Sequence, residues 1–234
     1  MKIKTMVAVT VALAAASSFA KDVDIGTFPI PLMVESPDKG VFVELTQAIA
    51  KASGQKVNIS VNPPKRTVEQ FSRKEIDCFF PALDVMLPGK AAKSGNIYVK
   101  QDFAFYQKGK KLTKLDEMKG KNVGITLGYP YAKEVTENKD IVLSSANDDI
   151  TSMKKLGLGR IDVFIVEEKS GLKALAESGQ ANIEYDKTTP LSKQDVYYAC
   201  QDTPEGRATA DKISAALKQM QSDGSFGAIM SKAK

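Results

Sequence analysis

Two motifs of the form Ile-Asp-x-Phe most constrain the fold of this chain. They lie in "RKEIDCFF" (73–80) and "LGRIDVFI" (158–165), and each leads from a basic residue into an apolar run. Each also follows the same expected order of strand, loop, helix, strand and helix. Because this alternation builds parallel sheets covered by helices, we predict an α/β protein of two similar lobes, each a mainly parallel sheet flanked by helices.

The expected elements follow from apolar spacing and from Gly and Pro breaks. In the first half we predict strands at 23–28 and 56–61, helices at 40–54 and 66–74, a buried strand through the first motif, a loop at 87–96 and an extended stretch at 97–109. In the second half we predict strands at 122–128 and 140–145, helices at 129–138 and 147–159, a buried strand through the second motif, an extended stretch at 188–202, and a helix at 204–222 that ends before Gly224.

The repeated aspartates, Asp77 and Asp162, each open the strand that follows a helix. We interpret them as equivalent topological positions, at the end of the sheet away from a ligand. The motifs stop agreeing five to seven residues downstream, at "FFPALD" and "FIVEE". We therefore expect the binding chemistry where the two copies diverge.

The first twenty residues have the three parts of a secretory signal peptide: a charged start, an apolar run at 6–16, and small residues before Lys21. The apolar run is too short to span a bilayer. We therefore expect cleavage after Ala20 and export of the remaining chain as a soluble protein.

Composition excludes several kinds of active site. The chain has no histidine, so it lacks the base of a Ser-His-Asp or Cys-His site and the commonest ligand of zinc sites. The lysines behind the net charge of +5 are scattered, and their densest run at 108–114 has no aromatic residue, which is typical of a solvated loop. We expect no metal, no cofactor and no nucleic-acid partner.

The two cysteines, Cys78 and Cys200, leave two alternatives. Export permits a disulfide, but each cysteine lies in an apolar, strand-like run where a buried free thiol is common. Since a disulfide demands a specific geometry, the sequence leaves both alternatives open.

Five segments carry a further signal. They are, in order, "FVELTQAIAKASGQKVNI", "PPKRTVEQFSRKEIDCFF", "LDEMKGKNVGITLG", "MKKLGLGRIDVFIVE" and "LKQMQSDGSFGAI". Together they resemble the polar-amino-acid branch (family 3) of the bacterial periplasmic solute-binding proteins of ABC transporters. The resemblance covers essentially the whole chain after the signal peptide at 1–20.

The resemblance implies the two-lobed periplasmic-binding-protein fold (type II), in which two hinge strands join the lobes and a small solute binds between them. The first lobe would comprise 21–102 and 191–234, and the second 103–190. The hinge strands are expected near 98–106 and 187–197. A cleft between lobes is a common place for a small ligand.

The resemblance carries over only part of the family's ligand contacts. Relatives that bind α-amino acids hold the carboxylate with an arginine after the first-lobe strand; here the nearest cation is Lys90, which lacks the bidentate fork. Asp84 falls where relatives carry a small residue or a hydroxyl, and Glu167 aligns with the family's aspartate for the ligand ammonium. Arg66, at the start of a helix, is the candidate anion clamp, with an ordinary surface arginine as the alternative.

Asp84 and Glu167 follow the carboxyl ends of the two motif strands, where ligands of open α/β sheets bind. One carboxylate from each lobe would suit a ligand with a cationic group. As lone surface acids the two residues would be unremarkable, and this alternative stays open.

Aromatic residues complete the expected site. The family's Gly-Ser-Thr-like loop here reads Gly128-Tyr129-Pro130-Tyr131, and we expect it to open a helix whose N-terminus suits an anion. Tyr129 and Tyr131 are candidates to stack on a ligand, with packing inside the lobe as the alternative. Phe28, just after the first strand, is the candidate aromatic of the first lobe.

The predicted function is capture of a small polar organic solute, amino-acid-like or an amine, by closure of the two lobes. The expected setting is the periplasm, with a monomer that delivers the solute to the membrane permease of an ABC importer. Two alternatives stay open: an enzyme similar to the periplasmic cyclohexadienyl dehydratases, with Glu167 as general acid, and a binding protein that presents its closed form to a membrane sensor.

Overall fold

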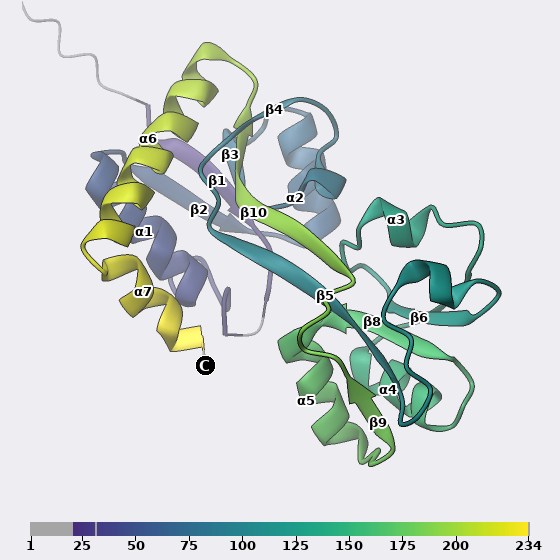
Figure 1. The fold of residues 1–234 in the computed structure, drawn as a ribbon. Helices are drawn as coiled ribbons and strands as arrows, with labels where there is room; N and C mark the ends of the chain where they lie inside the picture. The colour runs from purple at the N-terminus through teal and green to yellow at the C-terminus, as the bar shows by residue number, and fades with distance from the viewer. Residues whose placement is uncertain (1–20, 31, 234) are drawn as a thin grey trace, which may run out of the picture.

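The fold is seen in a computed structural model that describes residues 21–30 and 32–233. The expected signal peptide at 1–20 lies outside the described residues. Figure 1 shows two α/β lobes joined by two long strands, β5 (Tyr98–Gln107) and β10 (Ser192–Gln201). The predicted two-lobed fold is confirmed. Within the described ranges, no helix has both the length and the apolar character that crossing a membrane requires.

The first lobe follows the predicted order closely. Its elements are β1 (Val23–Thr27), α1 (Val41–Ser53), β2 (Val57–Val61), α2 (Pro64–Ser72), β3 (Cys78–Ala82), the 3-10 turn η1 (Asp84–Met86), β4 (Ala91–Lys93), and, after β10, α6 (Pro204–Ser222), α7 (Ser225–Met230) and η3 (Ser231–Ala233). The predicted loop at 87–96 is wrong in one respect, because β4 forms within it and pairs with β10.

The second lobe departs from the prediction at one helix. Its elements are η2 (Leu115–Met118), β6 (Asn122–Thr126), α3 (Lys133–Thr136), β7 (Val142–Ala146), α4 (Asp149–Gly157), β8 (Val163–Glu167), α5 (Glu168–Ser178) and β9 (Ile183–Tyr185). The helix expected at 129–138 is only the short α3. Leu127 and Gly128 form a turn, Tyr131 is buried with its hydroxyl accepting a hydrogen bond from the Thr126 N–H, and Ala132 still has extended backbone angles. Helix α5 and strand β9 were not among the predicted elements.

The strands run in the order β2-β1-β3-β10-β5-β8-β6-β7. Each lobe has a parallel core of three strands, β2-β1-β3 in the first and β7-β6-β8 in the second. The hinge strands β10 and β5 pair antiparallel with these cores and with each other. The sheet is therefore mixed, with its antiparallel part at the hinge.

The repeated motif makes the same backbone contacts in both lobes. The Asp77 N–H donates to the Asp24 carbonyl, and the Asp77 carboxylate accepts from the Asp24 N–H, each at 2.9 Å. In the second lobe Asp162 forms the same two bonds with Asn122, each at 2.8 Å. Each repeated aspartate thus fixes the start of the neighbouring parallel strand, and the predicted topological role is confirmed.

The isoleucine and phenylalanine of the motif both face a glycine of that neighbouring strand. Gly26 of β1 is in register with Phe79, and Gly124 of β6 with Phe164. A Cβ on Gly26 would lie 2.5 Å from Ile76 Cδ1, and one on Gly124 would lie 2.4 Å from Ile161 Cδ1. The motif therefore packs against a glycine in each lobe.

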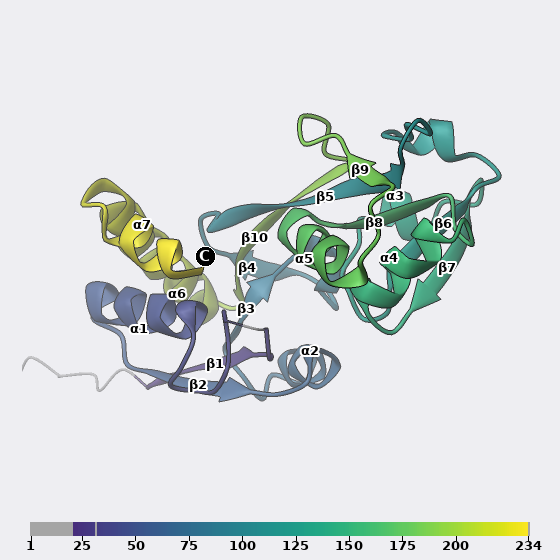
Figure 2. The same cartoon turned by 90° about the horizontal axis from the view of Figure 1, so that it is seen from below.

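Continuous apolar runs in the strands reflect burial on both faces. In β8, Phe164 and Val166 pack under α4 and α5, whereas Val163 and Ile165 face the core that contains Val135 of α3. In the first lobe one core lies under α1, α6 and α7, and the other under α2. Figure 2 shows these helices on the two sides of the first-lobe strands.

Cys78 and Cys200 form a disulfide, which decides between the two alternatives left by the sequence. The two residues are register partners on the antiparallel strands β3 and β10, and both are fully buried. The bond ties the hinge strand β10 covalently to the parallel core of the first lobe.

Candidate functional site

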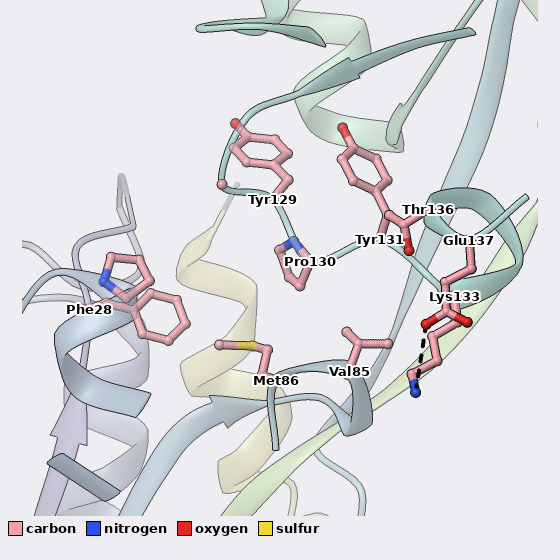
Figure 3. A pocket seen from close by; sticks show the side chains of 11 residues that line it. Phe28, Val85, Met86, Tyr129, Pro130, Tyr131, Lys133, Thr136 and Glu137 are labelled. Atoms are coloured by element: carbon pink, nitrogen blue, oxygen red, sulfur yellow. Dashed lines mark ion pairs between the residues drawn. The ribbon is translucent and has the colours of Figure 1, made fainter. Parts of the chain in front are cut away.

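A cleft of about 380 Å³ is lined by residues of both lobes. Figure 3 shows Phe28, Val85 and Met86 on one side and the rings of Tyr129 and Tyr131 on the other. The complete lining is Phe28, Pro64, Val85, Met86, Gly128, Tyr129, Pro130, Tyr131, Lys133, Thr136 and Glu137. Phe28, Tyr129 and Tyr131, three of the residues named above as candidates for ligand contact, thus line the same cleft.

The first-lobe wall is apolar. Phe28 follows β1 directly and is buried. Val85 and Met86 belong to η1, the turn that follows the carboxyl end of β3. These side chains offer an aromatic ring, a branched alkyl group and a thioether to a ligand, and a thioether adapts readily to varied shapes.

Asp84 opens this turn, but its carboxylate already has partners. Oδ1 accepts from Lys93 Nζ at 2.7 Å and from the Tyr197 hydroxyl. The hydrogen bond from Lys93, followed by that from Tyr197, lowers the pKa of Asp84 below its ordinary value of 3.8. Asp84 is not among the residues that line the cleft. Its observed contacts hold η1 against strands β4 and β10.

The two tyrosines of the second-lobe wall have different environments. Tyr131 is buried, and its hydroxyl oxygen accepts from the Thr126 N–H at 2.9 Å. Tyr129 is 41% exposed and donates its hydroxyl to Asp149 Oδ2 at 3.0 Å. Burial, followed by the Asp149 charge, raises the pKa of Tyr129 to about 12. Tyr129 therefore offers a neutral ring surface to a ligand, whereas Tyr131 packs in the lobe and also lines the cleft.

The predicted anion site at the start of a helix is wrong. Gly128–Tyr131 is not the first turn of a helix, because α3 begins only at Lys133 and has four residues. The two charged residues of the lining form an exposed ion pair with each other, with Lys133 Nζ 3.9 Å from Glu137 Oε1. The lining is thus mainly apolar and aromatic.

Arg66 and Glu167 lie outside the cleft lining. Arg66 is exposed in the first turn of α2, two residues after the lining residue Pro64. Glu167 ends β8 and caps α5, where its Oε2 accepts from the Ser170 N–H at 3.1 Å. Its charge also contributes, after burial, to the raised pKa values of Tyr98 and Tyr129. The carboxylate is therefore within electrostatic range of the hinge and of the cleft loop.

Among the residues that the structure describes, no group of three or more carboxylate, thiol or imidazole side chains is arranged to hold a metal ion.

Comparison with known proteins supports the family suggested by the sequence. No family model matches the chain. The L-cystine-binding protein TcyJ of Escherichia coli strain K12 is 27% identical over 232 aligned positions, which cover 88% of this chain and 79% of TcyJ. The resemblance to the bacterial solute-binding proteins is confirmed.

Solved structures show the same fold as this chain. The GluR0 ligand-binding core of Nostoc punctiforme, in complex with L-glutamate, superposes with a TM-score of 0.70 at 17% identity, over 90% of this chain and 98% of that one. An ancestral arginine-binding protein bound to glutamine superposes with a TM-score of 0.65 at 19% identity, over 90% and 96% of the two chains.

Sequence reasoning missed two groups of residues. Val85 and Met86 line the cleft beside the predicted Asp84, and their only signal was their place after the carboxyl end of a strand. Lys100 and Asp102, in the hinge strand β5, form a buried ion pair. The sequence feature that could have indicated it is a pair of opposite charges, two residues apart, just before the apolar run Phe103–Tyr106.

Proposed function

We propose that the chain captures a small amino acid in the cleft between its lobes and delivers it, in the closed form, to a membrane permease of an ABC importer. The observation that carries the proposal is a cleft with walls from both lobes beside a two-stranded hinge. Homology to an amino-acid-binding protein adds independent support. Export to the periplasm, a monomeric state, and lobes of 21–102 with 191–234 and of 103–190 belong to the same proposal.

The proposed mechanism is a shift between open and closed lobes. A solute that contacts Phe28 and Met86 on one wall and Tyr129 on the other gains its full set of contacts only when the lobes close. The closed state is therefore favoured in proportion to the difference in affinity between the two states. The permease would then recognise the closed arrangement of both lobes.

The lining favours an amino acid with an uncharged, apolar or sulfur-containing side chain. The charged lining residues Lys133 and Glu137 pair with each other, while rings, alkyl groups and a thioether make up most of the walls. L-cystine, which the relative TcyJ is named for, joins two amino-acid ends through a disulfide and is the first solute to test. L-glutamate, L-glutamine and L-arginine, named with other relatives, are the charged and polar comparisons.

Isothermal titration calorimetry and thermal unfolding with these four amino acids test the proposal. We expect at least one to bind with a single site per chain and to raise the unfolding midpoint. At a free ligand concentration 100 times its Kd, the stabilisation is about 2.7 kcal/mol. A midpoint unaffected by every amino acid, amine and small carboxylate would contradict the proposal.

Arg66 and Glu167 are proposed to hold the charged ends of the solute when the lobes close. Arg66→Met and Glu167→Gln should each weaken binding, by at least about tenfold for loss of a charged hydrogen bond. Arg73→Met at the other end of α2 and Glu168→Gln next to Glu167 are the matched controls, and they should bind as the wild type does. Equal effects of site and control variants would remove Arg66 and Glu167 from the site.

The enzyme alternative has less support, because the relatives are named as binding proteins. Incubation with prephenate and assay for phenylpyruvate separates it from solute binding. The sensory alternative uses the same cleft and the same closed form. Copurification of the liganded protein with a permease or with a receptor distinguishes these two partners.

A further inference from the structure

The two hinge strands carry four polar side chains at registered positions. Asp102 of β5 is in register with Ser192 of β10, and Lys100 with Gln194. Lys100 Nζ pairs with Asp102 Oδ1. Asp102 Oδ2 accepts from Ser192 Oγ at 3.0 Å and from Gln194 Nε2 at 3.4 Å. We call these four residues the hinge cluster.

Asp102 of the hinge cluster is buried and the other three residues are half-buried, although the cluster lies in the segment that joins the lobes. The side chain of Asp102 is 1% exposed and that of Lys100 is 11% exposed. A buried charge is stable only when it is paired and hydrogen-bonded. Asp102 is therefore the residue through which the other three side chains are linked.

The hinge cluster also touches the wall of the cleft. Gln194 Nε2 donates to the Pro130 carbonyl at 3.1 Å. Lys100 Nζ lies 5.6 Å from the centre of the Tyr131 ring, a cation–π distance. Both contacts fall on the 128–131 segment, which carries four lining residues of the cleft. None of the cluster residues lines the cleft itself.

We propose that Gln194, held by Asp102, is a positioning residue that couples the hinge strands to the 128–131 segment and so sets the affinity of the cleft. This role rests on the proposed function. The hydrogen bonds of Tyr129 with Asp149 and of Tyr131 with Thr126 hold the segment within the second lobe, whereas the bond from Gln194 to the Pro130 carbonyl comes from a hinge strand. Loss of the Gln194 bond should therefore loosen the 128–131 segment relative to the hinge without removing any group that touches the solute.

The hinge strands supply two matched controls. Gln107 of β5 donates from Nε2 to the carbonyls of Leu156 and Gly157, at 3.1 and 3.2 Å. Gln201 of β10 donates from Nε2 to the carbonyls of Phe71 and Ile76, at 2.8 and 3.0 Å. Both are half-buried glutamines that bind backbone carbonyls as Gln194 does, but their partners lie away from the cleft.

The test compares Gln194→Met, Gln107→Met and Gln201→Met by hydrogen exchange of the solute-free protein. Methionine keeps the size of the side chain and removes the donor. Loss of one neutral hydrogen bond should raise exchange at 127–132 about fivefold in Gln194→Met and leave it unchanged in the two controls. If Gln194→Met folds poorly, Gln194→Glu is the second variant. It replaces the donor by an acceptor, and exchange at 127–132 should rise in it as well.

Unchanged exchange at 127–132 in both Gln194 variants, or an equal rise in all three methionine variants, would overturn the proposal. Calorimetry with L-cystine is the second measurement, with about fivefold weaker binding expected for Gln194→Met and less than a twofold change for the controls. If the wild type binds no amino acid, the proposed function fails, while the exchange result still decides the role of Gln194.

Discussion

At the scale of single residues, the clearest feature is the contact of each repeated isoleucine with a glycine of the neighbouring strand. Gly124 allows Ile161 to pack on β6, as Gly26 allows Ile76 to pack on β1. The aspartate that follows accepts a hydrogen bond from the start of that same strand: Asp77 from the Asp24 N–H in the first lobe, and Asp162 from the Asn122 N–H in the second. The motif is therefore a packing device that both lobes share.

This packing predicts an energetic coupling between Gly124 and Ile161. Gly124→Ala would overpack the site and should destabilise the protein by about 1–3 kcal/mol. Ile161→Val removes Cδ1 and should cost about 0.5–1.5 kcal/mol by itself. In the double variant the new methyl group fills the space that Cδ1 leaves. Its loss of unfolding free energy, measured with urea, should therefore be at least about 0.5 kcal/mol smaller than the sum of the losses in the two single variants. Strict additivity would show that the contact is unimportant.

Asp84 predicts a pH effect, because Lys93 and Tyr197 lower its pKa in the folded protein. A lowered folded-state pKa gives stability that is present above the unfolded-state value and is lost as the pH falls through the folded-state value. Since the side chain is 71% exposed, solvent screening limits this contribution to less than about 1 kcal/mol.

Urea unfolding of the wild type and of Asp84→Asn at about pH 5 and about pH 3 measures this effect. The wild type should lose more stability between the two pH values than the variant does. Identical losses would mean that the Asp84 contacts contribute nothing to folding.

At the scale of elements, the disulfide joins β3 to the hinge strand β10 across a sequence separation of 122 residues. A long closed loop gains most from a crosslink, and removal of a native disulfide typically costs about 2–5 kcal/mol. The double variant Cys78→Ala/Cys200→Ala should therefore have a free energy of unfolding that is lower by that amount. Urea unfolding of the variant and of the oxidised wild type measures the difference.

The burial of both sulfur atoms supplies the control for this experiment. Dithiothreitol should leave the native wild type unaffected, because Cys78 and Cys200 are fully buried, and should act only once urea unfolds the first lobe. A double variant as stable as the oxidised wild type would show that the crosslink is energetically neutral.

At the scale of the whole molecule, the two lobes are joined through the hinge strands β5 and β10. Within the described chain, these strands pair with each other and are the only ones that connect the two parallel cores: β5 pairs with β8 of the second lobe, and β10 with β3 of the first. Bending of two strands moves one lobe as a unit relative to the other. The wall residues Phe28 and Met86 would then approach Tyr129.

Closure predicts that the radius of gyration measured by small-angle X-ray scattering decreases when a binding amino acid is added. The amino acids that do not change the unfolding midpoint serve as controls and should leave the radius unchanged. A solute that binds with no change in the radius would show that the cleft already has its final width.

The α/β class, the two lobes and most helices and strands could be predicted from the amino-acid sequence, because local apolar spacing, Gly and Pro breaks and a repeated motif are encoded within short segments. The sequence also indicated Phe28, Tyr129 and Tyr131 as candidates for the cleft. Features that depend on contacts between distant segments required the three-dimensional structure: the Cys78–Cys200 bond, the partners of Asp84, and the hinge cluster, in which Gln194 binds the Pro130 carbonyl. The shortened α3 belongs to this second group, since burial of the Tyr131 ring overrode the helical spacing of 129–138.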